Sequence, residues 1–494
     1  MATQHPDHAC RPYWHKEAFI PAVEETKELY NAFSDLNIEE YKWDWEGKLV
    51  DESVLERLLA EYFDYFKKHP LGKEKFLTFR LPNPKVETEF RLGRALMGIA
   101  SSAGLAKQVS MHSPPLFEVI LPMTESAEEM IAIQEAFAEI ANLKHPLNRF
   151  ENDLLSHIQI VPLFEQVSTI INSVDILEKY LLMHQKEFGF KPDYLRPYVA
   201  RSDPALNSGV VPTILAIKIA FSRYKKFAAK HKINLYPVIG VGSLPFRGGL
   251  YPFRPERFYH EYRGVRTAII QSAFRYDFPK TKVVSAIKYL NSHLPKGEAE
   301  MISADEETKI IKTIKPFEAG YKSTVEKIAP LINDLAKFLP KRRERVQHIG
   351  LFGYSRGIGK VSLPRAISFT AVLYSLGIPP ELIGTGRGLA AARKNGNLPL
   401  VEKYYKNLKH DLYFAGKFFY REGLHRLAKK SPGWKDILTD VVEIEKYLGK
   451  PLAPKYLNEQ EHQLLSARIH QNLKNGKQLT RLIEQSAVLR RSMG

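Results

Sequence analysis

The chain has 494 residues, of which 72 are lysine or arginine and 55 are aspartate or glutamate, so its formal net charge is +17. Its single cysteine, Cys10, excludes an intrachain disulfide and any metal site built from several cysteines. No apolar run approaches the roughly 20 residues that a membrane-spanning helix needs, and the polar first residues lack the apolar core of a secretion signal. We therefore expect a cytoplasmic protein with no membrane partner.

The positive charge favours anionic partners, from small acidic metabolites to nucleic acid. The basic clusters, such as those at 341–345 and 429–430, are short and interrupted, which is typical of solvated surface. No basic stripe with interleaved aromatic residues is present, so nucleic acid is not an expected partner. A basic nucleic-acid-binding protein is the alternative from another class, and it would show a steep salt dependence of binding.

Short apolar runs alternate with helical segments over most of the chain. Residues 1–24 show no clear period, and residues 25–70 are predicted to be helical. The residues that end the later runs are Arg80, Met123, Glu165, Asp203, Arg247, Arg275 and Arg356. Strands and helices alternating at this spacing indicate βα units and a parallel sheet. Seven runs, with a possible further strand at the terminus or overlooked, approach the eight strands of a TIM barrel.

The C-terminal third is predicted to be helical with short breaks from residue 376 onward. These helices are expected to pack around the barrel or between subunits. No low-complexity linker interrupts the chain. The expected fold is therefore an α/β TIM (β/α)8 barrel with additional helices, and residues 1–494 are expected to form one domain.

Two carboxylates end neighbouring runs, Glu165 and Asp203. In a TIM barrel the loops after the strands share one face, so these side chains should meet there. Together with water and a substrate oxygen, they suit an octahedral Mg²⁺ or Mn²⁺ ion. The alternative is that each forms a structural ion pair with a nearby arginine.

Several arginines should meet at the same face, and one of them lies in the stretch 239–252. There Arg247 is followed by Gly248 and Gly249. Glycines let backbone N–H groups approach a ligand, and arginine holds phosphate or carboxylate with two hydrogen bonds. These features favour a substrate that carries both groups. The alternative is an ordinary loop with a solvated arginine.

His5 lies before a proline, which restricts its backbone to an extended conformation. From the residues alone, a frayed and exposed terminus is the alternative to a site residue.

Six motifs, in order along the whole chain, resemble those of the archaeal-type phosphoenolpyruvate carboxylases. They are TQHPD at 3–7, FEVILPM at 117–123, VPLFE at 161–165, ARSDPALN at 200–207, GSLPFRGG at 242–249 and QSAFRYD at 271–277. The resemblance implies a Mg²⁺- or Mn²⁺-dependent TIM barrel, usually a homotetramer. It implies that phosphoenolpyruvate and bicarbonate give oxaloacetate and phosphate, through carboxyphosphate and a metal-stabilised enolate.

The resemblance also assigns roles to residues. Glu165 and Asp203 match the metal ligands, and His5 matches the histidine that takes the carboxyphosphate proton in the longer plant and bacterial enzymes. Four arginines match those that clamp phosphate and the intermediate: Arg80, Arg247, Arg356 and Arg365. Arg201, Arg254 and Arg275 have no unambiguous match in the longer enzymes. Arg201, Arg275, Gly248 and Gly249 are expected to contact substrate.

The chain departs from the longer enzymes in one place. They carry a lysine shortly after the metal aspartate, whereas this chain has Leu206 and Asn207, so another residue must position bicarbonate. The resemblance also suggests that the tail ending at Gly494 approaches the active site. The rival among enzymes is another phosphoenolpyruvate- or pyruvate-handling metal barrel, such as an aldolase, which would not depend on bicarbonate.

Overall fold

The computed structural model describes residues 1–48, 50–87, 89–111, 113–142, 155–344, 356–358, 361–473 and 475–494. For residues 89, 356–358 and 477 it describes the backbone only.

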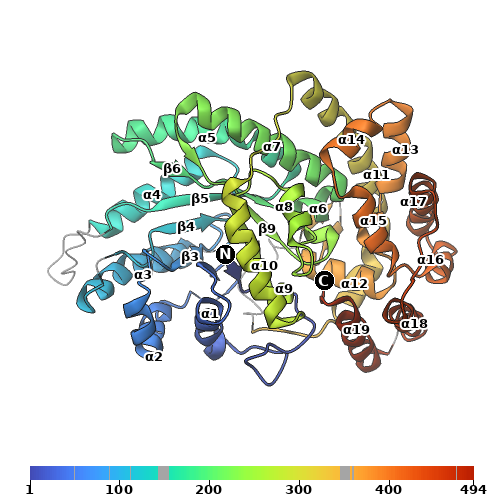
Figure 1. Ribbon diagram of the computed structural model, residues 1–494, viewed down its shortest axis with the longest axis horizontal. Coiled ribbons are helices and arrows are strands. Elements are labelled where there is room, and N and C mark those ends of the chain that lie inside the picture. The colour runs from blue at the N-terminus through green and yellow to red at the C-terminus, as the bar shows by residue number, and fades with distance from the viewer. Residues whose placement is uncertain are drawn as a thin grey trace.

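Eight parallel strands close into a barrel in the order β1-β10-β9-β7-β5-β4-β3-β2 (Figure 1). They are β1 (Ala2–Thr3), β2 (Glu40–Asp44), β3 (Phe76–Arg80), β4 (Glu118–Leu121), β5 (Gln159–Phe164), β7 (Tyr198–Ala200), β9 (Val238–Val241) and β10 (Thr267–Ile270). Branched and aromatic residues of β4, β5, β7, β9 and β10 fill the barrel with a buried cluster of their own. The predicted TIM barrel with additional helices is confirmed.

Helices follow most strands and cover the outside of the barrel. They are α1 (Glu25–Ser34), α2 (Val54–Lys68), α3 (Glu89–Gln108), α4 (Ala127–Ala141), α5 (Val167–Phe188), α6 (Ser202–Ser208), α7 (Val210–His231), α8 (Pro255–Glu261), α9 (Ser272–Tyr276) and α10 (Lys280–His293). Local signals set their ends. The Ser126 side chain accepts a hydrogen bond from the Glu129 N–H at the start of α4, and Gly189 ends α5 in the left-handed conformation.

The C-terminal helices gather beside the barrel, at the orange and red end of the colour scale in Figure 1. They are α11 (Ala304–Ala336), α12 (Ala366–Ser375), α13 (Thr385–Lys394), α14 (Leu398–Tyr404), α15 (Leu408–Gly416), α16 (Arg421–Ala428), α17 (Pro432–Leu448), α18 (Leu457–Gln471) and α19 (Gly476–Arg490). Short 3₁₀ helices are η1 (Ala22–Glu24), η2 (Pro245–Arg247), η3 (Leu294–Lys296) and η5 (Pro380–Leu382). Helix α11 packs against α7 on the barrel side and against α13 and α17 on the other, so it joins the two layers.

Within the described chain, no single helix is long and apolar enough to cross a membrane. One bent pair, Ala366–Ser375 with Pro380–Lys394, meets the criterion of length and composition together, with a bend of 96°. Most residues of α12 are buried against other helices of the fold.

The structure corrects two strand assignments. Residues 40–44, predicted to be helical, form β2. The eight barrel strands all lie between Ala2 and Ile270, and the apolar run at 346–352 lies outside the described residues. Arg356 begins β11 (Arg356–Ile358), which pairs with β12 (Val361–Leu363) in a separate two-stranded sheet. Another small sheet joins β6 (Tyr194–Leu195) to β8 (Asn234–Leu235).

Candidate active site

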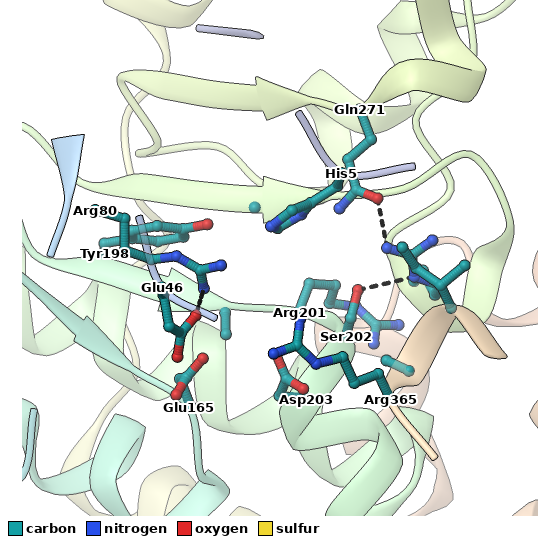
Figure 2. A pocket seen from close by; sticks show the side chains of 15 residues that line it. His5, Glu46, Arg80, Glu165, Tyr198, Arg201, Ser202, Asp203, Gln271 and Arg365 are labelled. Carbon is teal, nitrogen blue, oxygen red and sulfur yellow. Dashed lines mark hydrogen bonds and ion pairs between the residues drawn. The ribbon is translucent and has the colours of Figure 1, made fainter. Parts of the chain in front are cut away.

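A cavity opens at the carboxyl ends of the barrel strands, where the active site of a TIM barrel is expected. Its polar lining residues come from eight separate segments of the chain (Figure 2). They are His5, Glu46, Arg80, Glu165, Tyr198, Arg201, Ser202, Asp203, Arg247, Gln271 and Arg365. Residues as far apart in the chain as His5 and Arg365 therefore meet at one place, although the strand rhythm had predicted only the run-ending carboxylates and arginines there.

Arg80, the last residue of β3, is bound to two carboxylates. Its Nε and Nη2 donate to Asp44 Oδ1 at 2.5 Å and Oδ2 at 2.6 Å, and its Nη1 pairs with Glu46. Burial alone would lower the pKa of Arg80, but Asp44 and Glu46 raise it well above its usual range. One guanidinium facing two carboxylates gives this cluster a net negative charge.

Glu165 lies beside this cluster, directly after β5, and Asp203 lies in the first turn of α6 after the neighbouring strand β7. Carboxylate oxygens on a negatively charged wall are the donors that Mg²⁺ and Mn²⁺ prefer. No group of three or more His, Cys, Asp or Glu side chains among the described residues could hold a metal alone. The two carboxylates therefore fit a divalent ion whose remaining ligands are water and substrate oxygens.

Arg247 presents a different environment, although its exposed fraction is only 2%. Its Nη1 pairs with Asp7 at 3.3 Å and also donates to the oxygen of Gly494, while Nε donates to the Ser202 hydroxyl and Nη2 to the Gln271 amide oxygen. Burial lowers the pKa of Arg247, and Asp7 only partly opposes this effect. Arg247 therefore faces one side-chain carboxylate, whereas Arg80 faces two.

Arg201 holds the loop that carries Arg247. Its Nε donates to the Tyr262 hydroxyl at 3.0 Å, its Nη1 to the Phe246 carbonyl at 2.9 Å and its Nη2 to the Pro245 carbonyl at 3.1 Å. Although Arg201 borders the cavity, all three nitrogens donate to protein oxygens. Its observed role is to support the loop.

Glu381, on η5, holds the same loop from its other side. Its Oε1 accepts hydrogen bonds from the Phe246 N–H at 2.7 Å and from the Tyr374 hydroxyl at 2.6 Å. Burial raises the pKa of Glu381 to about 7. Because Phe246 precedes Arg247, this carboxyl group helps to set the position of the guanidinium.

Gly248 and Gly249 allow the loop to turn, with φ angles of 125° and 68°. A Cβ on Gly248 would lie 2.6 Å from Val241 Cγ1, so only glycine fits there. Their N–H groups donate to the carbonyls of Pro245 and Leu244. The glycines thus shape the loop, and these two donors are used within it.

His5 is firmly held, so the alternative of a frayed terminus is wrong. It follows β1, and its carbonyl accepts hydrogen bonds from the Ser272 hydroxyl at 2.7 Å and the Ser272 N–H at 3.3 Å. Its Nε2 lies 3.4 Å from Asp44 Oδ2 and 3.4 Å from Lys42 Nζ. Burial and, next, the charge of Lys42 lower the pKa of His5 well below its usual value. The ring is therefore neutral and able to accept a proton.

A family model described as phosphoenolpyruvate carboxylase matches residues 1–494. The chain is 38% identical to the phosphoenolpyruvate carboxylase of Leuconostoc mesenteroides, over 100% of this chain and 98% of that protein. It is 38% identical to that of Metallosphaera sedula, over 100% and 99%, and 37% identical to that of Pyrococcus horikoshii, over 89% and 93%.

The chain belongs to the phosphoenolpyruvate carboxylase family.

The resemblance inferred from the six motifs is thereby confirmed. In this member of the phosphoenolpyruvate carboxylase family, the cavity contains seven of the residues singled out in the sequence. These are His5, Arg80, Glu165, Arg201, Asp203, Arg247 and Arg365. Arg365 stands at the N-cap of α12 and reaches the cavity from the C-terminal layer.

Three predicted arginines are not brought to this cavity by the described structure. Arg275 lies in α9 and is 1% exposed, and its Nη2 donates to the Thr3 carbonyl and to Glu28. Arg254 is largely exposed. The side chain of Arg356 lies outside the described residues.

The sequence did not predict the charged residues of β2, of which Lys42 and Asp44 lie next to His5 and Arg80. Glu40, Lys42 and Asp44 point into the barrel, whereas the aromatic residues between them pack outward. Strict alternation of charged and aromatic residues over 40–46 was the signal that could have identified this strand. Asp7 and Gln271 lie in the TQHPD and QSAFRYD motifs, but only the fold brings them to Arg247.

Proposed function

We propose that this protein carboxylates phosphoenolpyruvate with bicarbonate, giving oxaloacetate and inorganic phosphate. The observation that carries the proposal is that a carboxylate-rich wall and the buried Arg247 line one cavity. A substrate with a phosphate, a carboxylate and an enol oxygen needs both environments. The family membership supports the same reaction.

The arginine side would bind the charged groups of the substrate. Arg247 and Arg365 present guanidinium groups that suit phosphoryl and carboxylate oxygens. Positive charge held in place at the phosphoryl oxygens stabilises them as bicarbonate attacks phosphorus. The products of that attack are carboxyphosphate and the enolate of pyruvate.

The carboxylate side would stabilise the negative charge of the enolate. A Mg²⁺ or Mn²⁺ ion held by Glu165 and Asp203 would supply Lewis-acid stabilisation of negative charge on a substrate oxygen. His5, neutral and adjacent, would take the proton from carboxyphosphate, which then separates into CO₂ and phosphate. Carbon–carbon bond formation between the enolate and CO₂ completes the reaction. We also propose that the protein works in the cytoplasm as a homotetramer, which light scattering at a range of protein concentrations would test.

The test is an oxaloacetate assay coupled to malate dehydrogenase, run with and without bicarbonate and Mg²⁺. We expect oxaloacetate and phosphate in equal amounts, with no oxaloacetate when either component is omitted. Consumption of phosphoenolpyruvate without any dependence on bicarbonate would instead favour another metal-dependent barrel reaction.

Asp203→Asn sharpens this assay, because an amide is a weaker ligand for a divalent ion than a carboxylate. We expect a loss of at least about 1,000-fold in metal-dependent turnover, since removal of one electrostatic group costs roughly 100- to 1,000-fold even without a metal. Asp193→Asn, on an exposed residue outside the cavity, is the matched control. Full turnover by Asp203→Asn would remove Asp203 from the site.

A further inference from the structure

Lys42 is a buried lysine inside the barrel, next to His5. It lies at the centre of β2, where alternation turns its side chain toward the barrel interior, and its exposed fraction is 0%. Its Nζ is 3.4 Å from His5 Nε2 and 6.0 Å from the centre of the Tyr198 ring. In the described part of the chain, no carboxylate lies within ion-pairing distance of Nζ. A buried ammonium whose close polar contact is a histidine differs from the usual paired lysine.

Lys42 and Asp44 compete for the same nitrogen of His5. Lys42 Nζ and Asp44 Oδ2 each lie 3.4 Å from Nε2. An ammonium group can only donate a hydrogen bond, whereas an ionised carboxylate can only accept one. When Nε2 carries a lone pair, it therefore accepts a hydrogen bond from Lys42. When Nε2 carries the proton, it donates one to Asp44. These two states exclude each other.

We propose that Lys42 is a positioning residue that selects the tautomer of His5. When Lys42 is charged, it donates to Nε2, the His5 proton is on Nδ1, and the ring offers a bound reactant a donor. When Lys42 is neutral, Nε2–H donates to Asp44 and Nδ1 holds the lone pair that can accept a proton. This role rests on the proposed function, in which His5 is the base.

The groups around Lys42 bring the pKa of its ammonium group close to neutral pH. The groups that face it are His5 after β1, Asp44 of β2, Glu46 after β2, Arg80 of β3 and Glu165 after β5. Burial and, next, the charge of Arg80 lower the pKa of Lys42 to about 8, against the opposing effect of the carboxylates. Both protonation states of Lys42 are therefore populated near neutral pH.

The same arrangement governs the proton after His5 has accepted it at Nδ1. The imidazolium then carries protons on both nitrogens, with Nε2–H directed to Asp44. Burial disfavours this cation, because it is the largest cause of the lowered pKa of His5. The proton is therefore returned readily, and the phosphate released from carboxyphosphate is the group that can receive it.

Chemical labelling of His5 tests the proposal without turnover. Diethyl pyrocarbonate acylates an imidazole lone pair, and mass spectrometry of the peptide that contains His5 gives the rate at each pH. With Lys42 charged, the only lone pair lies against its ammonium group. We expect the rate at His5 to rise with a midpoint near pH 8 in the unmodified protein, as Lys42 loses its proton. Exposed His69 reports the activity of the reagent in the same sample.

Lys42→Met removes the competitor while keeping a side chain of similar length. We expect the midpoint at His5 to move down by at least about one pH unit, the usual size of a shift caused by one adjacent charge. Lys75→Met is the matched control, because Lys75 is also buried but donates to the Ile38 carbonyl at the opposite end of the barrel. It should leave the His5 profile unchanged. An identical midpoint in Lys42→Met and the unmodified protein would overturn the proposal.

Lys42→Arg decides the matter if circular dichroism shows that Lys42→Met does not fold. A permanent charge should keep His5 unreactive up to pH 9, and reactivity like that of the unmodified protein would contradict the proposal. If neither variant folds, a midpoint of the unmodified protein at or below about 6.5, the ordinary value for histidine, contradicts it. A protein that makes oxaloacetate but fails these labelling tests refutes only the role of Lys42. A protein that passes the labelling tests but makes no oxaloacetate refutes only the carboxylase function.

Discussion

The cavity has two sides that use arginine in opposite ways. On one side, Arg80 is bound by two carboxylates, and the pKa of its guanidinium is raised well above the usual range. On the other side, Arg247 pairs with one carboxylate at 3.3 Å, and burial lowers its pKa. The first side places two side-chain carboxylates around its arginine, and the second places only one.

This difference shows that the residue type alone does not reveal the task. Both arginines follow or end an apolar run, and both were expected to clamp phosphate. Arg80 in the structure orders Asp44 and Glu46 beside Glu165, whereas Arg247 is the group better placed to attract an anion. Stability and activity measurements on matched variants should separate the two roles.

The largest expected effect is on stability, from Arg80→Met. It would leave Asp44 and Glu46 buried without their partner, which costs about 3–5 kcal/mol of unfolding free energy. Urea unfolding measures this change, with Arg254→Met, at a largely exposed arginine, as control. If Arg80→Met loses no more stability than the control, the carboxylates do not depend on Arg80.

Arg247→Lys should act mainly on activity. Lysine keeps the charge beside Asp7 but cannot reproduce the planar guanidinium fork. We expect kcat/KM for phosphoenolpyruvate to fall about 100-fold, with a smaller loss of stability than in Arg80→Met. Arg254→Lys is the matched control. A variant that retains full activity would show that Arg247 supports the loop without binding substrate.

A pH-dependent effect concerns Glu381, which supports the Arg247 side only. Its pKa is raised to about 7, so its protonated form is favoured by folding. Its contribution to stability is complete below the unfolded value, about 4.3, and is lost as the pH rises through about 7. We expect this loss to amount to roughly 3–4 kcal/mol between pH 4 and pH 8, and to be absent in Glu381→Gln. Urea unfolding of both proteins across this range measures it, and parallel curves would contradict the assignment.

The sequence was sufficient for the barrel because most strands are apolar runs that end in a polar residue, as at Arg80 and Glu165. It was insufficient for β2, whose alternating residues lie in a region with helical neighbours. It was also insufficient for β1, because two residues are too short to show a period. Both of these strands carry or precede candidate site residues, namely Asp44 and His5.

Glu165, Asp203 and Arg247 could be named from the sequence because each ends a run that the fold aligns with the others. The supporting contacts could not, because they depend on tertiary packing. Arg201 was expected to touch substrate, but the three carbonyl and hydroxyl oxygens around it come from residues more than 40 positions away. Glu381 reaches the same loop from 135 positions away.

Transfer of oxygen from labelled bicarbonate tests the central claim most directly. With bicarbonate labelled in all three positions by ¹⁸O, attack on phosphorus predicts one labelled oxygen in the phosphate and two in the new carboxylate of oxaloacetate. Mass spectrometry of both products measures this distribution. Phosphate released without label would contradict the proposal that both sides of the cavity act on carboxyphosphate and the enolate.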